Sequence, residues 1–234
     1  MLIPKVIHRV WCGPHKIPDD HERYWETWKV LSRRYRFELF TWNEDSLIAN
    51  GLVNKETFNQ CQHYSEMSDI ARYELLYKFG GIYVDTDFEL LDPLKFVNLI
   101  NRVTNFCSQL EFDRLAVGII GVMANHPLYK ILVNNIKNNC KPTNESYTLG
   151  PLYYSAIVSA WQQKFRLNDL TIFERRLFYP YHWEETNKKD ELIANLNPVA
   201  VHHWAVSYRN PKFKKVNQRN HLDESHMGHT DLED

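Results

Sequence analysis

Apolar residues recur at helical spacing over residues 65–79, and this stretch predicts the clearest helix of the chain. Two glycines follow it as a stop signal, and a short apolar run over residues 82–84 then predicts a buried strand. That strand runs directly into Asp85-Thr86-Asp87. Two carboxylates are therefore expected at the carboxyl end of a buried strand, which is where open α/β sheets bind their ligands.

The same spacings predict further elements along most of the chain. Strands are predicted over residues 5–11, 37–42 and 199–201, and helices over residues 20–32, 126–138, 152–164 and 188–195. This mixture of buried strands and helices indicates the α/β class. Residues 1–210 are expected to form one domain. Residues 211–234 are expected to form a weakly ordered polar tail, because they lack periodicity.

The composition narrows the class of partner. A chain of 234 residues with 44% hydrophobic residues can form one large α/β domain or two small ones. Its 28 Lys and Arg residues balance 29 Asp and Glu residues, which argues against a nucleic-acid partner. No apolar run reaches the ~18 residues of a membrane span and no signal peptide is evident, so a cytoplasmic location is expected. The 4 cysteines are scattered and are expected to be reduced thiols.

Asp85 and Asp87 are the strongest candidates for metal binding. Side chains two residues apart on a strand point the same way, so both carboxylates can reach one hard cation such as Mn²⁺ or Mg²⁺. Two aspartates near a turn are often only solvated, so the neighbouring residues matter. A calcium EF-hand would need glycine where Leu90 stands, and a dehalogenase-type phosphatase would need threonine where Glu89 stands.

Asp69 and Arg72 lie one helical turn apart in the predicted helix. Their spacing alone favours an exposed ion pair on the helix surface. A second interpretation places them in the same cleft as the two aspartates. There the planar fork of Arg72 would bind sugar or phosphate oxygens, and Asp69 would accept hydrogen bonds from sugar hydroxyls.

Aromatic and histidine residues add candidate contacts to this cleft. Trp11 ends the first strand, where an aromatic ring can stack on a nucleobase, although a core position is the commoner role. Tyr83 could supply a second ring. Of the pair His202-His203, one imidazole could complete a metal site. Donors to a diphosphate are expected from Ser207 and Tyr208.

Taken together, these motifs resemble the DXD-containing glycosyltransferases of family 32, which include fungal mannosyltransferases and sugar transferases of polysaccharide biosynthesis. The matching segments are residues 3–11, 68–73, 80–87, 150–151 and 202–208. Tyr208 departs from the family pattern, which more often has tryptophan there. The same segments are similar to the catalytic core of the clostridial glucosylating toxins.

The resemblance implies an α/β fold of the GT-A, Rossmann-like type and a retaining transfer of a hexose. It also implies a role for each candidate residue. Val10 and Trp11 would lie at the nucleobase with Tyr83 nearby, Asp69 and Arg72 would contact the donor sugar, and Ser207 and Tyr208 would contact the diphosphate. Asp85 would lie between ribose and metal, Asp87 would be the principal metal ligand, and His203 would be a third ligand, with His202 as the alternate. The implied cofactor is Mn²⁺ or Mg²⁺. A UDP-sugar donor is favoured over GDP-mannose, because the segment at Val10 looks like a uridine-binding one.

The acceptor is expected to be a glycan or another hydroxyl compound. Binding to such an acceptor could also bring the protein to a membrane surface as a peripheral protein. Variable loops within residues 101–151 and 177–183 are expected to bind it.

Two other functions remain open at this point. One is a non-catalytic nucleotide-sugar or glycan-binding protein, which the intact pair of aspartates disfavours. The other is a metal-dependent phosphohydrolase or nucleotidyltransferase, in which Glu89 or Asp92 would join Asp85 and Asp87 in a carboxylate cluster. That second interpretation leaves the histidine pair and Arg72 without a role.

Overall fold

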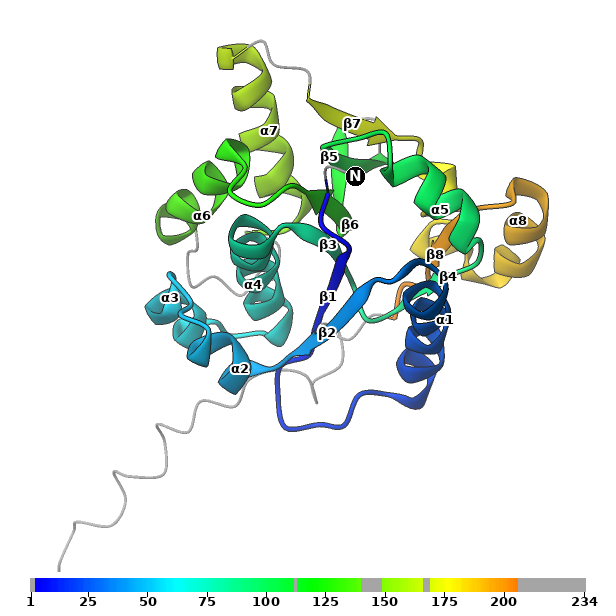
Figure 1. The fold of residues 1–234 in the computed structure, drawn as a ribbon, viewed down its shortest axis with the longest axis horizontal. Helices are drawn as coiled ribbons and strands as arrows, with labels where there is room; N and C mark the ends of the chain where they lie inside the picture. The colour runs from blue at the N-terminus through cyan, green and yellow to red at the C-terminus, as the bar shows by residue number, and fades with distance from the viewer. Residues whose placement is uncertain (1–2, 112, 140–148, 166–168, 206–234) are drawn as a thin grey trace, which may run out of the picture.

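The computed structural model describes residues 3–111, 113–139, 149–165 and 169–205. A six-stranded mixed sheet runs through the molecule in the order β2-β1-β3-β6-β5-β7 (Figure 1). Its strands are β1 (Val6–Val10), β2 (Glu38–Trp42), β3 (Gly81–Val84), β5 (Asn105–Glu111), β6 (Arg114–Val122) and β7 (Leu170–Phe173). β1 pairs in parallel with β2 and β3, and β7 in parallel with β5, whereas β6 runs antiparallel to β3 and β5.

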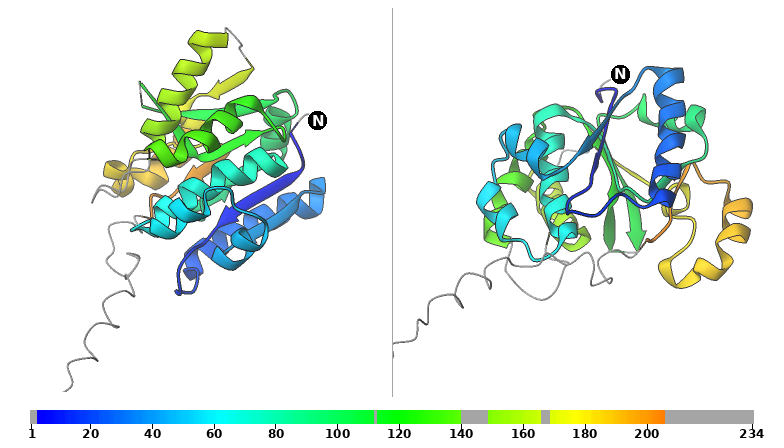
Figure 2. Two further views of the ribbon diagram at one scale, coloured as in Figure 1. Left: turned by 90° about the vertical axis from the view of Figure 1, so that its left-hand side faces the viewer. Right: turned by 90° about the horizontal axis from the view of Figure 1, so that it is seen from below.

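Helices cover both faces of this sheet (Figures 1 and 2). One face is packed by α4 (Tyr64–Phe79), α6 (Pro127–Asn139) and α7 (Pro151–Phe165). The opposite face is packed by α1 (Asp19–Tyr35) and α5 (Pro93–Ile100). The sheet therefore separates two hydrophobic cores.

The sequence of the central strand β3 is a continuous apolar run because both of its faces are buried. Tyr83 is buried in the core beneath α4, while Ile82 and Val84 are buried in the core beneath α1. Because successive side chains of a strand point to opposite faces, a strand covered on both sides needs apolar residues at every position. The chain becomes partly exposed just past the carboxyl end of β3, at Asp85.

A separate two-stranded sheet lies beside this end. It pairs β4 (Phe88–Leu90) with β8 (Ala200–His202) in antiparallel fashion, and Phe88 faces His202. The chain reaches β8 through η1 (Arg175–Leu177), η2 (Trp183–Lys188) and α8 (Lys189–Leu196). The pairing brings a segment from the end of the described chain to the two aspartates.

Most elements predicted from the sequence are confirmed, with ends shifted by a few residues. The strands β4, β5, β6 and β7 were not predicted, nor were α5 and the short helices α2 (Glu44–Ala49) and α3 (Lys55–Gln60). The predicted boundary at residue 210 and the tail over residues 211–234 lie outside the described residues.

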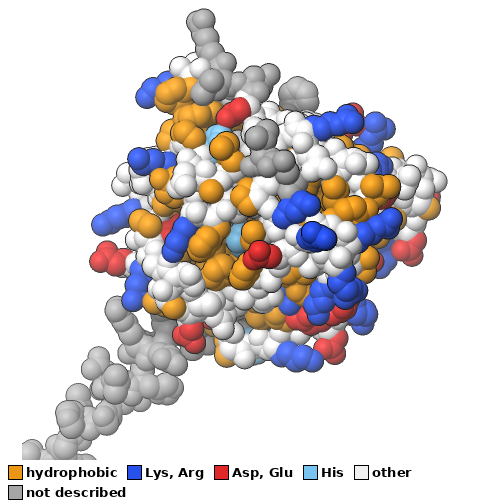
Figure 3. Space-filling view, viewed as in Figure 1, with side chains coloured by type: hydrophobic (Ala, Val, Ile, Leu, Met, Phe, Trp, Pro, Cys, Tyr) orange, Lys and Arg blue, Asp and Glu red, His pale blue; other side chains and the backbone are white. Residues whose placement is uncertain are grey.

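The surface fits the near-neutral composition. On the face shown in Figure 3, basic and acidic side chains are interspersed with apolar ones. Within the described residues, none of the helices is both long enough and apolar enough to cross a membrane.

Candidate active site

The two aspartates line a cleft of about 610 Å³. β3 ends at Val84, and the chain turns there: the backbone N–H of Asp85 donates to the carbonyl of Gly118 on β6 at 2.8 Å. Gly118 also keeps space for the carboxylate, since a Cβ atom at this position would lie 2.6 Å from Asp85 Oδ2. Gly118 of the neighbouring strand thus positions Asp85 in two ways: its carbonyl accepts the hydrogen bond, and it has no side chain to clash with the carboxylate.

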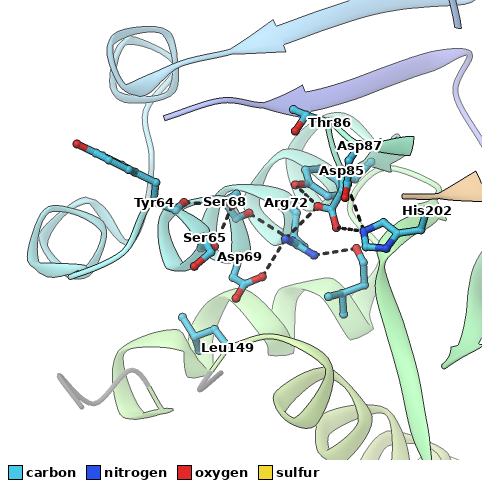
Figure 4. A network of polar contacts seen from close by, with 12 residues as sticks. Tyr64, Ser65, Ser68, Asp69, Arg72, Asp85, Thr86, Asp87, Leu149 and His202 are labelled. Carbon is cyan, nitrogen blue, oxygen red and sulfur yellow. Dashed lines mark hydrogen bonds and ion pairs between the residues drawn. The ribbon is translucent and has the colours of Figure 1, made fainter. Parts of the chain in front are cut away.

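Asp85, Asp87 and His202 form a compact group of potential metal ligands. One ligand atom from each lies within 4.8 Å of the others (Figure 4). His202 Nε2 is 3.2 Å from Asp87 Oδ1 and 3.7 Å from Asp85 Oδ2. The backbone N–H of Ala205 donates to Asp87 Oδ2 at 2.8 Å, which fixes the orientation of that carboxylate.

The histidine at the aspartates is therefore His202, and the expectation that His203 takes this place is corrected. His203 Nε2 lies 2.8 Å from Glu89 Oε2, and its ring stacks on Tyr24 with centroids 4.2 Å apart. The reason is the alternation of side chains along β8 and its extension: His202 faces the cleft, so the next residue faces away from it.

This arrangement also removes the carboxylate cluster that a phosphohydrolase or nucleotidyltransferase would have used. Glu89 is turned to His203. Asp92 is the N-cap of α5, where its side chain accepts a hydrogen bond from the backbone N–H of Lys95 at 2.8 Å. Neither residue belongs to the potential metal-ligand group of Asp85 and Asp87.

The charges of the group depend on one another. Burial alone would raise the pKa of Asp85, but Arg72 and His202 hold it well below its usual range. Burial likewise opposes the charge on Asp87, and His202 lowers the pKa of that carboxyl. For His202 burial favours the neutral ring, yet the two aspartates raise its pKa to about 9. The imidazolium of His202 therefore offsets part of the negative charge of the two carboxylates.

Arg72 connects this group to α4. Its Nη2 lies 2.9 Å from Asp69 Oδ1 and 3.3 Å from Asp85 Oδ1, and Nη1 donates to the carbonyl of Val117 at 2.9 Å. Its guanidinium also lies 4.6 Å from the ring centre of Tyr83. The side chains of Arg72 and Asp69 are only 6% and 9% exposed, so the expected exposed ion pair is wrong.

Burial makes the negative charge of this pair costly. Burial raises the pKa of Asp69 to about 7, against the pull of Arg72. Arg72 lines the main cleft, and Asp69 lines a smaller adjoining cavity of about 150 Å³. The structure therefore brings both residues to the site, with Arg72 already engaged by protein oxygens.

The residues expected at a nucleobase lie at another part of the cleft. Val10 and Trp11 line it from the end of β1, and the indole N–H of Trp11 donates to the carbonyl of His15 at 2.7 Å. Tyr83 is not an exposed second ring: it is 1% exposed, and its hydroxyl donates to Asp85 Oδ1 at 2.8 Å. It supports the carboxylate instead. Ser207 and Tyr208 lie outside the described residues.

Several lining residues were not predicted. Ser65 and Ser68 line the cleft from the face of α4 that carries Arg72, so helical spacing back from Arg72 could have found them. Cys12, His21, Tyr64 and Leu152 also line the cleft and carry no motif in the sequence. The other lining residues fall within segments already singled out: Thr86, Pro151, Trp204 and Ala205 lie in the segments that resemble family 32, and Leu110, Glu111, Arg114, His182 and Trp183 lie within the ranges expected to bind the acceptor.

Known proteins share this combination of sequence and fold. Residues 18–107 match the family described as "Glycosyltransferase sugar-binding region containing DXD motif". The chain is 26% identical over 189 residues to an uncharacterized glycosyltransferase, L373, of Acanthamoeba polyphaga mimivirus, covering 76% of this chain and 74% of that protein. It is 29% identical over 227 residues to inositol phosphoceramide mannosyltransferase 3 of Schizosaccharomyces pombe, covering 87% of this chain and 60% of that protein.

Two further likenesses complete the comparison. Lactosylceramide 4-alpha-galactosyltransferase of Mus musculus is 26% identical over 151 residues, or 60% of this chain and 40% of that enzyme. The ligand-free glycosyltransferase domain of the YGT toxin superposes with a TM-score of 0.51 at 10% identity, over 84% of this chain and 87% of that domain, and thus shares the fold. The mixed sheet is that of GT-A domains, and the DXD motif of the matched region is Asp85-Thr86-Asp87. The chain is therefore similar to the glycosyltransferases whose sugar-binding region contains a DXD motif, and the matched region spans residues 18–107.

Proposed function

We propose that this chain is a retaining hexosyltransferase that depends on a divalent cation. It moves a hexose from a nucleotide sugar onto a hydroxyl group of a glycan or other acceptor. A UDP-sugar donor is favoured over GDP-mannose. The observation that carries the proposal is the convergence of Asp85, Asp87 and His202 beside Arg72 at the cleft. The hexose is supported by the names of two relatives, a mannosyltransferase and a galactosyltransferase.

The residues present fit the implied cation. Two carboxylates and one imidazole offer ligand atoms within 4.8 Å of one another, a donor set that Mn²⁺ or Mg²⁺ accepts while leaving positions for diphosphate oxygens. Asp85, Asp87 and His202 would hold the cation, with His202 giving up its proton to bind as a neutral imidazole. Bound there, it would neutralise the negative charge that develops on the departing nucleoside diphosphate.

The remaining residues would hold the donor in place. Arg72 orients Asp85 and adds a fixed positive charge at the same spot, so it stabilises the leaving group without reorganisation during the reaction. Val10 and Trp11 would bind the nucleobase at the other part of the cleft. In the reaction the bond between the anomeric carbon and the diphosphate oxygen breaks, and its electron pair leaves with the diphosphate. The acceptor hydroxyl attacks from the same side and its proton passes to the departing phosphate.

The names of two relatives suggest where the acceptor comes from. One acts on inositol phosphoceramide and the other on lactosylceramide, so a glycolipid acceptor would bring this chain to a membrane surface. The cytoplasmic location predicted from the sequence stays a prediction.

The test is a donor panel. The protein is incubated with Mn²⁺ and with UDP-glucose, UDP-galactose, UDP-N-acetylglucosamine or GDP-mannose, and nucleotide release is measured with and without saccharide acceptors. We expect release from at least one donor, stimulation by acceptor, and loss of both in excess chelator. The configuration of the product is read by NMR. Release that is metal-independent, or a product of inverted configuration, would contradict the corresponding part of the proposal.

A further inference from the structure

The cleft continues beyond the residues that the donor would occupy. Val10 and Trp11 lie at the end of β1, on one side of β3 in the sheet order, whereas β6 and β5 lie on the other side. Val84, the last residue of β3, pairs with Ile119. The earlier part of β6 therefore projects past the end of β3, and with β5 it forms a hairpin that borders the cleft opposite the proposed nucleobase position.

A continuous line of contacts joins this hairpin to the metal-ligand group. The ring of His202 meets the indole of Trp204 edge-on at 4.6 Å, and Trp204 lies 5.6 Å from the ring of His182. His182 Nε2 is 3.7 Å from Glu111 Oε1, and Glu111 Oε2 is 3.6 Å from Arg114 Nη1. We call these residues beyond His202, together with Trp183, the outer wall.

The outer wall exposes an aromatic, an acidic and a basic side chain to solvent. Trp183 is 39% exposed, and the side chains of Glu111 and Arg114 are 42% and 43% exposed. All three line the cleft. An indole face packs against the C–H face of a pyranose ring, while a carboxylate and a guanidinium accept from and donate to its hydroxyls. One acid and one base leave this pair without net charge.

We propose that the outer wall is an acceptor subsite that binds a neutral sugar ring, with Trp183 as its stacking platform and Glu111 and Arg114 as its hydroxyl contacts. The proposal rests on the proposed function and adds the class of acceptor group and the residues that select it. A strongly anionic acceptor is disfavoured, because the single guanidinium of Arg114 is already balanced by Glu111. The bound ring presents one hydroxyl to the anomeric carbon of the donor, and that hydroxyl's proton leaves with the diphosphate as described above.

The experiment compares acceptor and donor kinetics in Trp183→Ala, Trp183→Phe and Glu111→Gln. Methyl glucoside, methyl galactoside, methyl mannoside and lactose serve as neutral acceptors, and glucose 6-phosphate as an anionic one. We expect Trp183→Ala to raise the KM of the best neutral saccharide at least tenfold, with Trp183→Phe intermediate and Glu111→Gln raised severalfold. The donor KM and the Kd for UDP should stay within twofold of wild type. Phe165→Ala, an aromatic residue of similar exposure at the end of α7, is the matched control and should change none of these values.

Binding without turnover gives a second readout. Saturation-transfer NMR of the same methyl glycosides, with UDP and Mg²⁺ present, should show contact in wild type and a loss of contact in Trp183→Ala. An active wild type whose saccharide KM and NMR contact are unchanged in Trp183→Ala and Glu111→Gln overturns the subsite but leaves the transferase intact. So does a wild type that transfers to the phosphorylated sugar in preference to neutral ones, or to no saccharide at all. A wild type that releases nucleotide from no donor overturns the proposed function itself.

Discussion

Nε2 of His202 lies 3.2 Å from Oδ1 of Asp87, and this contact ties the last described strand to the turn after β3. If the pair holds a cation, removing the imidazole should weaken cation binding. We expect His202→Ala to lower Mn²⁺ affinity at least tenfold, since even the loss of groups that only orient a ligand costs ~10–100-fold. Titration of Mn²⁺ followed by electron paramagnetic resonance measures it. His203→Ala is the matched control, because its ring contacts Glu89 and Tyr24 instead, and equal losses in the two variants would refute the assignment.

Asp87 is predicted to be needed for turnover more than for folding. Asp87→Asn keeps the shape of the side chain and its capacity to accept from Ala205 N–H, but it removes the charge that would hold a cation. We expect transfer to fall at least a hundredfold while the circular dichroism spectrum is kept. Turnover near the wild-type value in saturating Mn²⁺ would exclude Asp87 from the mechanism.

Arg72→Lys should affect both stability and activity, although it conserves the charge. A lysine ammonium cannot span Asp69, Asp85 and the carbonyl of Val117 together, so buried oxygens lose their partner. We expect the free energy of unfolding in urea to fall by about 2–3 kcal/mol, with donor turnover strongly reduced.

The control for this variant is another i,i+3 pair. Arg23 pairs with Asp20 on the surface of α1, where the side chains are 71% and 61% exposed. Arg23→Lys should change stability by less than about 0.5 kcal/mol. Similar losses in the two variants would mean that burial does not distinguish the pairs.

Stability should rise with pH between about 4 and 6.5 because of His8. The ring is buried between the indole N–H of Trp42, which donates to Nδ1 at 3.1 Å, and the carbonyl of Gly80, 3.0 Å from Nε2. Burial lowers its pKa from 6.5 to about 4, although the Gly80 hydrogen bond opposes the shift. The unfolded chain therefore binds a proton in this range that the folded chain does not.

Lowering the pH from 7.5 to 5 should cost on the order of 2 kcal/mol of unfolding free energy through this one group. Urea denaturation at the two pH values measures the difference. His8→Gln has no titrating ring and should show a pH dependence smaller by that amount. An unchanged dependence would mean that another group titrates.

Trp11→Ala tests the nucleobase position. Stacking of a base on an aromatic ring contributes ~1–3 kcal/mol, so the donor KM and the Kd for UDP should rise roughly tenfold to a hundredfold. Calorimetry on the folded variant measures the Kd. A Kd equal to that of wild type would remove the base contact, whereas Trp183→Ala should not affect it.

The sequence predicted those parts of the fold in which one physical pattern dominates. β3 is apolar throughout because both of its faces are buried, and two glycines mark the end of α4 before it. β5 was not predicted from the sequence, because the fully buried polar residues Asn105 and Ser108 interrupt the apolar pattern. The helices α2 and α3 have only 6 residues each, too few to show a period.

The site was predictable to the extent that it is local in sequence. Asp85 and Asp87 share one strand end, and Asp69 and Arg72 share one helix. The choice between His202 and His203 depended on where a strand ends, since a shift of one residue turns a side chain to the opposite face. The outer wall lies on segments far apart in the chain, and only the tertiary fold shows that they meet.

The six-stranded sheet is complete at Phe173, whereas His202 comes from β8, which pairs only with β4 in a separate sheet. During synthesis, the strands of this sheet and both aspartates are thus made before His202, which offsets part of their charge. Until β8 docks, Asp85 and Asp87 repel each other without the imidazolium of His202. The group of Asp85, Asp87 and His202 can therefore be completed only after the last strand of the main sheet has been made, by the docking of a three-residue strand.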